Sequence, residues 1–288
     1  MTLFGWAIGF GLVTASILAL GAVGLTLQFG VTNFANFAYG DMMTLAIYLT
    51  WVLSGHLPFW LAVTIAALAM ALIAVLLSES VLGPFVRQGA PPLILLIVTF
   101  GLSLIINNVV LAIWGASSRQ LPVVPGNPIN LGPFLLTPSQ LVTMLFGVAA
   151  MLGIHFILTY TRLGKAMRAV SDNPDLAKVS GIPPASVTRF AWALTGVLSA
   201  LSGVALAVST AGFSPALGES FLFVLFAAVI LGGVGKPYGA MLGALIIGVI
   251  TEVSALFIPQ YKLDVAFVVL IAALLLRPEG LLRSPGKV

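Results

Sequence analysis

Long apolar runs recur along the whole chain. They lie at 3–27, 33–54, 59–77, 91–113, 138–160, 187–210, 220–234, 237–258 and 263–277. A helix needs about 20 mostly apolar residues to cross a hydrocarbon core of roughly 30 Å, and most of these runs are long enough. The runs between 220 and 258 fit either two short spans or a broken, re-entrant pair. The pattern therefore predicts an all-α, polytopic integral membrane protein with eight or nine transmembrane helices.

The stretch "VTNFANFAYGD" at 31–41 interrupts this pattern with two asparagines, a glycine and an aspartate. Non-helical backbone persists at membrane depth only where protein or a water-filled cavity surrounds it. We therefore expect a helix break here, in which Asn33, Asn36, Tyr39, Gly40 and Asp41 line the route of a polar solute. The alternative is that these side chains only break the helix and satisfy the freed backbone groups.

The same pattern returns in the second half of the chain. Ala-Tyr-Gly-Asp at 38–41 is echoed by Ala-Leu-Gly-Glu at 216–219, and an apolar run follows each. With alternating spans, the first run travels outward and the second inward. This arrangement indicates an inverted-topology repeat, which transporters use to build a central pathway. Gly218 and Glu219 therefore join the residues that we expect along the pathway.

Charge sets the orientation. The chain is 60% hydrophobic and only 7% charged, whereas a soluble domain carries roughly 25% charged residues. Nine alternating spans place ten of the twelve basic residues on one side and leave Arg119 and Lys262 on the other. The positive-inside rule then predicts an external N-terminus and a cytoplasmic C-terminus. The basic excess needs no nucleic acid as a partner, and the external, proline-rich 114–137 stretch is expected to be irregular but stiff.

Candidate chemistry is sparse. The chain has no cysteine, and His56 and His155 stand in no metal-binding motif. A resemblance to a phosphate loop at 232–239 fails because Ile230 occupies the position that needs the first glycine. We therefore expect no enzyme activity, no cofactor and no metal on this chain. Glu252 is the one acid expected deep in the bilayer, either for ion-coupled transport or as a locally paired structural residue.

The polar segment 161–187 is expected to contain a short helix of its own. Asn173 suits the N-cap, Pro174 the first turn and Asp175 the positive helix end. Gly181 is placed to end the helix. Such a helix between two spans either inserts into a groove on a cytoplasmic partner or rests on lipid headgroups.

This segment resembles the coupling region of LivH-type branched-chain amino-acid ABC transporter permeases. The family pattern there is roughly R-x-G-x-A-x-R-A followed by D-x-x-x-A-x-x-x-G-I. This sequence matches it at Arg162, Gly164, Ala166, Arg168 and Ala169, and then, counted from Asn173, at Ala177, Gly181 and Ile182. Asp172 is one position out of register with the pattern. The stretches 33–40, 227–248 and 274–282 also resemble the family.

The resemblance implies that 1–288 form a single permease domain of a binding-protein-dependent importer in a bacterial or archaeal plasma membrane. It implies a LivM-type second permease, two cytoplasmic ATPase subunits that bind ATP and Mg²⁺, and an external substrate-binding protein. The residues implied in ATPase coupling within 161–187 are Arg162, Gly164, Arg168, Asn173, Asp175, Ala177 and Gly181. The solute would be a branched-chain or other amino acid, or urea or an amide. An ion-coupled secondary transporter of a small polar solute is the alternative from another energy class.

Overall fold

The computed structural model describes residues 2–210, 212–276 and 280–281, and its elements are almost all helices. In chain order they are α1 (Thr2–Thr32), α2 (Tyr39–Ser54), α3 (Phe59–Leu77), a π turn (Ser78–Leu82), α4 (Gly83–Arg87), α5 (Pro92–Trp114), β1 (Ile129–Leu131), β2 (Phe134–Leu136), α6 (Pro138–Tyr160), α7 (Arg162–Asp172), α8 (Pro174–Val179), α9 (Pro184–Ser209), α10 (Leu217–Gly232), α11 (Pro237–Ser254), a 3₁₀ turn (Pro259–Tyr261) and α12 (Lys262–Leu276). Arg277 and 282–288 of the predicted cytoplasmic C-terminus lie outside the described residues.

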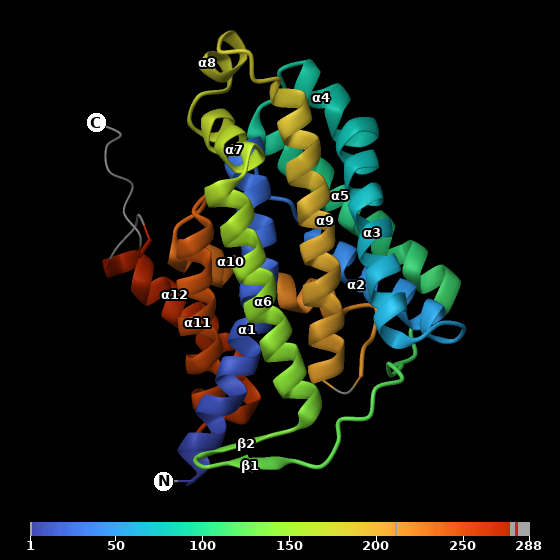
Figure 1. Ribbon diagram of the computed structural model, residues 1–288, viewed down its shortest axis with the longest axis vertical. Helices are drawn as coiled ribbons and strands as arrows, with labels where there is room; N and C mark the ends of the chain where they lie inside the picture. The colour runs from blue at the N-terminus through green and yellow to red at the C-terminus, as the bar shows by residue number, and fades with distance from the viewer. Residues whose placement is uncertain (1, 211, 277–279, 282–288) are drawn as a thin grey trace.

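The helices form an elongated bundle whose long axis follows most of their axes (Figure 1). Among the described residues, six helical stretches are long and apolar enough to cross a membrane: 3–32, 59–87, 92–114, 138–160, 184–209 and 237–254. This confirms the prediction of a polytopic, all-α membrane protein. Aliphatic and aromatic side chains cover much of the outer surface of α3, α5 and α6, as expected where lipid is the solvent.

Two shorter helices begin in the middle of the bundle. The apolar run at 33–54 is helical only from Tyr39, because 33–38 form an irregular connection out of α1. In the same way, α10 begins at Leu217 after an irregular connection out of α9. Figure 1 shows α2 and α10 leaving the middle of the bundle toward opposite ends. The helix breaks and their opposed directions agree with the sequence-based expectation.

The helix pair α10–α11 is packed very closely. A Cβ atom added at Gly239 would meet the carbonyl oxygen of Gly232. One added at Gly243 would meet the carbonyl oxygen of Ala228. Small residues at four-residue spacing allow such approach where lipid provides no hydrophobic drive for helix association. The uncertain region 220–258 therefore consists of the shorter helix α10 and the span-length helix α11.

Helix α1 forms the centre of the bundle and packs mainly against α9 and α11. Most of its side chains from Ala15 to Leu27 are buried, and so is most of the C-terminal half of α9. At its start, Gly5 and Gly9 lie against Pro133 and Phe134 of a short antiparallel hairpin formed by β1 and β2. The expectation of a wholly irregular 114–137 stretch was therefore wrong at its end, where the hairpin packs against α1.

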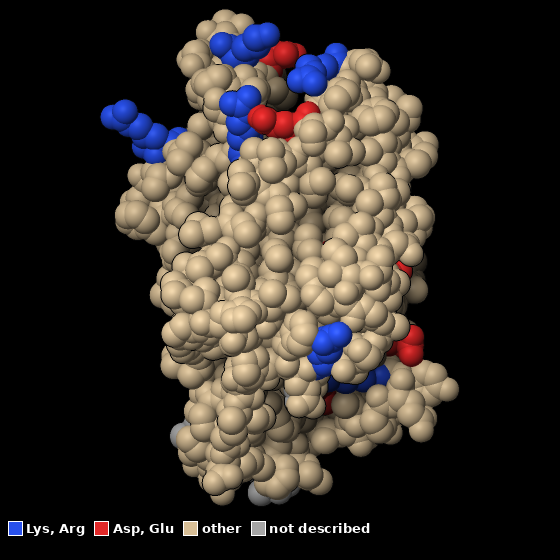
Figure 2. Space-filling view, turned by 90° about the vertical axis from the view of Figure 1, so that its right-hand side faces the viewer, with Lys and Arg blue, Asp and Glu red and all other residues tan. Residues whose placement is uncertain are grey.

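The polar segment after α6 folds into two short helices rather than the one that the sequence predicts. α7 buries Gly164, Met167 and Val170, which lie three residues apart on one face. α8 then begins at Pro174, as expected from its capping residues. Figure 2 shows that lysine and arginine side chains gather at this end of the molecule and are sparse along its middle. A charged end above an apolar belt fits a helix bundle that stands across a membrane.

Candidate functional site: two opposed helix breaks

The first break is stabilised by side chains. Asn36 is buried, and its Nδ2 donates to Gln28 Oε1 at 3.0 Å while its Oδ1 accepts from Ala38 N at 3.0 Å. The backbone N–H of Phe37 donates to Thr99 Oγ1 on α5 at 3.2 Å. Polar backbone that leaves a helix at membrane depth needs partners of this kind. Asn36 therefore performs the backbone-satisfying role that the sequence left as one of two interpretations.

Asn33 lies at the edge of this break. It is exposed, its φ is +61°, and its N–H donates to Phe29 O at 2.7 Å. Asparagine is one of the few residues with a side chain that adopts this left-handed conformation readily. The geometry therefore gives Asn33 a part in ending α1.

Asp41 is the centre of a buried polar cluster. Its side chain is 1% exposed, and it accepts hydrogen bonds from Ser103 Oγ and, at 3.1 Å, from Asn107 Nδ2. The same Asn107 amide lies 3.3 Å from Pro215 O in the second break. The Asn107 amide of α5 therefore links the Asp41 carboxylate, at the start of α2, to the second break. Sequence reasoning missed both α5 residues, although the Asn-Asn pair at 107–108 inside an apolar span was a usable signal.

The two repeat glycines lie against each other. An added Cβ at Gly40 would meet the carbonyl oxygen of Gly218, and one at Gly218 would meet the carbonyl oxygen of Gly40. Thr44, which the sequence analysis also missed, accepts from Gly218 N at 3.1 Å. The structure thus brings together two segments that the sequence related only by their similarity.

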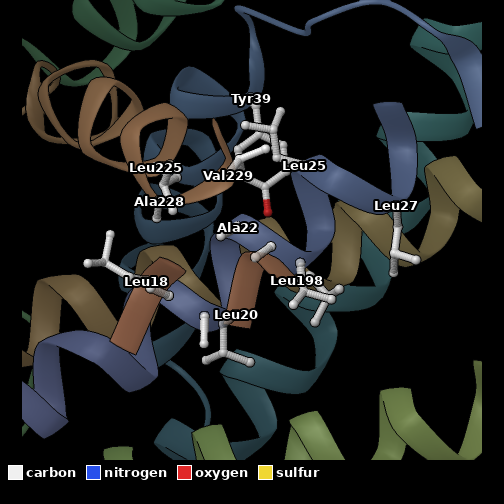
Figure 3. Close-up of a cluster of buried hydrophobic side chains, with 14 of the residues drawn as sticks. Leu18, Leu20, Ala22, Leu25, Leu27, Tyr39, Leu198, Leu225, Ala228 and Val229 are labelled. Atoms are coloured by element: carbon white, nitrogen blue, oxygen red, sulfur yellow. The ribbon is translucent and has the colours of Figure 1, made fainter. Parts of the chain in front are cut away.

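Tyr39 lies in a different environment from the polar cluster. Its ring is fully buried in the main apolar core. Figure 3 shows it beside Leu25 and Val229, with its hydroxyl directed toward α1. That hydroxyl has no hydrogen-bond partner among the described residues. In this conformation the Tyr39 ring packs among apolar side chains of the core, and its hydroxyl lies close to Gly24 of α1.

Glu219 lies in the first turn of α10, where the positive end of the helix favours a carboxylate. It is exposed, and its charge acts on Asp41 across the meeting point of the two helices. Ser220 and Asn108 are exposed as well. An exposed carboxylate is costly against lipid, so the start of α10 at Glu219 needs protein or water beside it.

The residues expected in coupling lie at the end formed by α7 and α8. Arg162, Gly164 and Arg168 belong to α7, where Gly164 packs directly against the last turn of α6 and Arg168 donates to Leu158 O. Asn173 caps α8 by accepting from Leu176 N at 2.9 Å, and Asp175 stands in its first turn.

α8 itself presents an apolar tip. Its Ala177 is buried, whereas Leu176 is 64% and Val179 is 86% exposed. Gly181, with φ of +83°, ends this segment. The capping and termination that the sequence predicts are thus confirmed. Two exposed aliphatic side chains on a short, rigidly capped helix form a suitable contact for another protein.

Glu252 is locally paired. It accepts from Thr14 Oγ1 of α1 at 2.7 Å and from Lys262 Nζ of α12 at 2.5 Å. Its side chain is 14% exposed. These contacts join three helices and agree with the structural interpretation of this acid rather than with ion coupling.

Comparison with known proteins identifies the family. The family model described as "Branched-chain amino acid transport system / permease component" matches residues 7–274. The chain belongs to this permease family. It is 28% identical to the high-affinity branched-chain amino acid transport system permease protein BraD of Pseudomonas aeruginosa, over 96% of this chain and 94% of the relative. It is 29% identical to LivH of Escherichia coli K12 over the same shares.

A more distant likeness covers half of the chain. The ribose import permease protein RbsC of Bacillus subtilis is 33% identical over 50% of this chain and 47% of the relative. No solved structure matches the chain. The family assignment confirms the resemblance on which the sequence analysis relied.

Proposed function

We propose that this chain is the membrane-spanning permease subunit of an importer that carries branched-chain amino acids and is driven by ATP hydrolysis on separate subunits. The observation that carries the proposal is the family match over 7–274. BraD and LivH each align with 96% of this chain, and both are named as branched-chain amino acid permeases. These names support branched-chain amino acids as the solute class. In this arrangement the whole chain is one permease domain, and it neither hydrolyses ATP nor holds a cofactor.

The partners follow from this role. Two cytoplasmic ATPase subunits would bind ATP and Mg²⁺, and an external binding protein would deliver the solute. A second, LivM-type permease would cover the face at the start of α10 on which Glu219 and Ser220 are exposed. That face supports the assignment because lipid would penalise its polar side chains.

The pathway would run beside the two opposed breaks. The exposed carboxylate of Glu219 suits the ammonium group of an amino acid, and the buried Asp41 carboxyl group and the Asn107 amide lie beside it between the breaks. Gly40 and Gly218 let the two helix starts approach closely enough to form one site. Tyr39 and Asn33 would act indirectly, through packing and through the end of α1.

The segment 161–187 would couple the permease to its ATPases. α8 would dock by Leu176 and Val179, and α7 would transmit its movement to α6 through Gly164 and Arg168. Contacts that differ between the ATP-bound and ATP-free dimers would shift the permeases between outward-open and inward-open states. This assignment places the N-terminus outside and the basic end cytoplasmic, as the positive-inside rule expects.

Reconstitution tests the proposal directly. The chain, its second permease and the ATPases would be placed in liposomes with the binding protein, and uptake of leucine, isoleucine, valine, amides and urea measured. We expect ATP-dependent uptake that prefers the branched-chain amino acids and survives a protonophore. Uptake that collapses with the protonophore and needs no ATPase subunit would assign the chain to ion-coupled transporters instead.

A further inference from the structure

A second polar feature lies away from the helix breaks. A pocket of about 480 Å³ opens between α1, α6, α7 and α11. Ligand pockets for small molecules fall in the range of about 300–1,000 Å³. No residue of the connections 33–38 or 212–216 lines it. The pocket is therefore separate from the proposed pathway.

Its lining combines both signs of charge with aliphatic surface. Arg168 and Asp172 come from α7 and Lys236 from the start of α11. The remaining wall is mainly apolar and is formed by Leu27, Val31, Leu158, Met167 and Pro237. The N-terminus of α11, which favours an anion, also faces this space through Lys236, Pro237 and Tyr238.

Thr26 supplies an independent sign of a ligand. It lines the pocket, its side chain is fully buried, and its hydroxyl has no hydrogen-bond partner among the described residues. Buried hydroxyl groups are normally paired, because an unpaired one costs free energy. Threonines elsewhere in the spans, such as Thr50, donate to a carbonyl of their own helix. The Thr26 hydroxyl is thus a buried, unpaired polar group in the wall of the pocket.

We propose that this pocket binds a free aliphatic amino acid and that the bound molecule restrains α7. The carboxylate would lie near Arg168 and the start of α11, the ammonium group near Asp172, and the side chain against the apolar wall. A ligand held by α7 on one side and by α1 and α11 on the other ties the coupling segment to the body of the bundle. Imported amino acid would therefore slow the ATPases from the cytoplasmic side. This regulatory role rests on the proposed function and orientation.

A phosphatidylethanolamine headgroup shares this zwitterionic chemistry. The two candidate ligands reach the pocket differently: the lipid enters from the membrane, whereas the amino acid binds from solution. We commit to the amino acid because the pocket is lined by α7, which belongs to the charged end, and because its apolar wall suits a short branched side chain better than a polar headgroup.

The test uses the complete importer in nanodiscs of phosphatidylcholine, without the binding protein. Binding of radiolabelled leucine and the ATPase rate would be measured for the natural chain, Thr26→Val and the matched control Thr50→Val. We expect saturable binding that Thr26→Val weakens several-fold and Thr50→Val leaves unchanged. Saturating leucine should lower the ATPase rate several-fold, and less so in Thr26→Val, while the ATPase rate without leucine stays the same in both variants.

Ligand chemistry gives a readout that does not depend on a variant. Leucinamide lacks the carboxylate and 4-methylpentanoate lacks the ammonium group, so both should bind several-fold more weakly than leucine. Equal binding of all three, absence of saturable binding, or binding unaffected by Thr26→Val would overturn the proposal. Leucine binding that disappears in discs containing phosphatidylethanolamine would assign the pocket to the lipid and overturn it as well. Loss of this binding with intact ATP-driven uptake in liposomes would leave the proposed transport function standing.

Discussion

Gly40 and Gly218 lie so close that neither position has room for a Cβ atom, because each would meet the other's carbonyl oxygen. Each glycine is the second residue of a half-length helix, and 178 positions separate them in the chain. Their contact fixes the point from which α2 and α10 run apart.

Gly40→Ala and Gly218→Ala should each destabilise the protein. The added methyl group would press on backbone rather than on a flexible side chain, and overpacking of this kind costs about 1–3 kcal/mol. Thermal unfolding of the purified chain measures the loss. Gly153→Ala in α6 is the matched control, because nothing lies within 4 Å of an added Cβ there. Equal stability of Gly218→Ala and Gly153→Ala would contradict the close approach.

Asp41→Ala should lower stability by leaving the Ser103 hydroxyl without its acceptor and removing one of the two acceptors of the Asn107 amide, at a cost of about 1–3 kcal/mol. Glu219→Gln should change uptake without such a loss, because Glu219 is exposed. Measuring unfolding and uptake for both variants separates the two roles. If Glu219→Gln transported like the natural chain, the face of α10 would lose its place in the proposed pathway.

Asn33 should tolerate glycine and resist a β-branched residue. Glycine adopts a φ of +61° without strain, whereas a β-branched residue at this position adds roughly 1–2 kcal/mol of strain. We expect Asn33→Gly to retain uptake and Asn33→Val to be less stable. A folded Asn33→Gly variant that fails to transport would show instead that the side chain contacts the solute.

Replacement of Gly181 should uncouple transport without harming membrane insertion. Its φ of +83° is strained for any bulky residue, although open space surrounds the position. Gly181→Val should therefore distort the end of α8 and reduce both uptake and its link to ATP hydrolysis. Gly181→Asn, which tolerates this conformation better, should be milder. Full activity of the valine variant would argue against docking through α8.

Glu252→Gln should leave uptake intact and cost about 1 kcal/mol of stability. The change removes the charge that pairs with Lys262 but keeps an oxygen for Thr14. Uptake by this variant in liposomes, with and without a protonophore, checks the expectation. Transport abolished in a stable Glu252→Gln protein would revive the ion-coupled interpretation.

The sequence by itself determined the features that depend on neighbouring residues. Apolar length located the spans, and the polar cluster at 31–41 located the first break. The capping of α8 by Asn173 could also be read directly, because its side chain bonds only three positions along the chain. These are local effects, so composition and spacing were enough to predict them.

Tertiary structure alone decided what lies against what. The sequence related 38–41 to 216–219 by similarity, but only folding placed Gly40 on Gly218 and Asn107 between Asp41 and Pro215. Folding also buried Tyr39 in apolar surroundings. The polar residues beside Tyr39 in the sequence did not suggest this environment. Buried polar groups and close backbone contacts take whichever partners the packing of distant helices provides, so spacing along one chain could not reveal them.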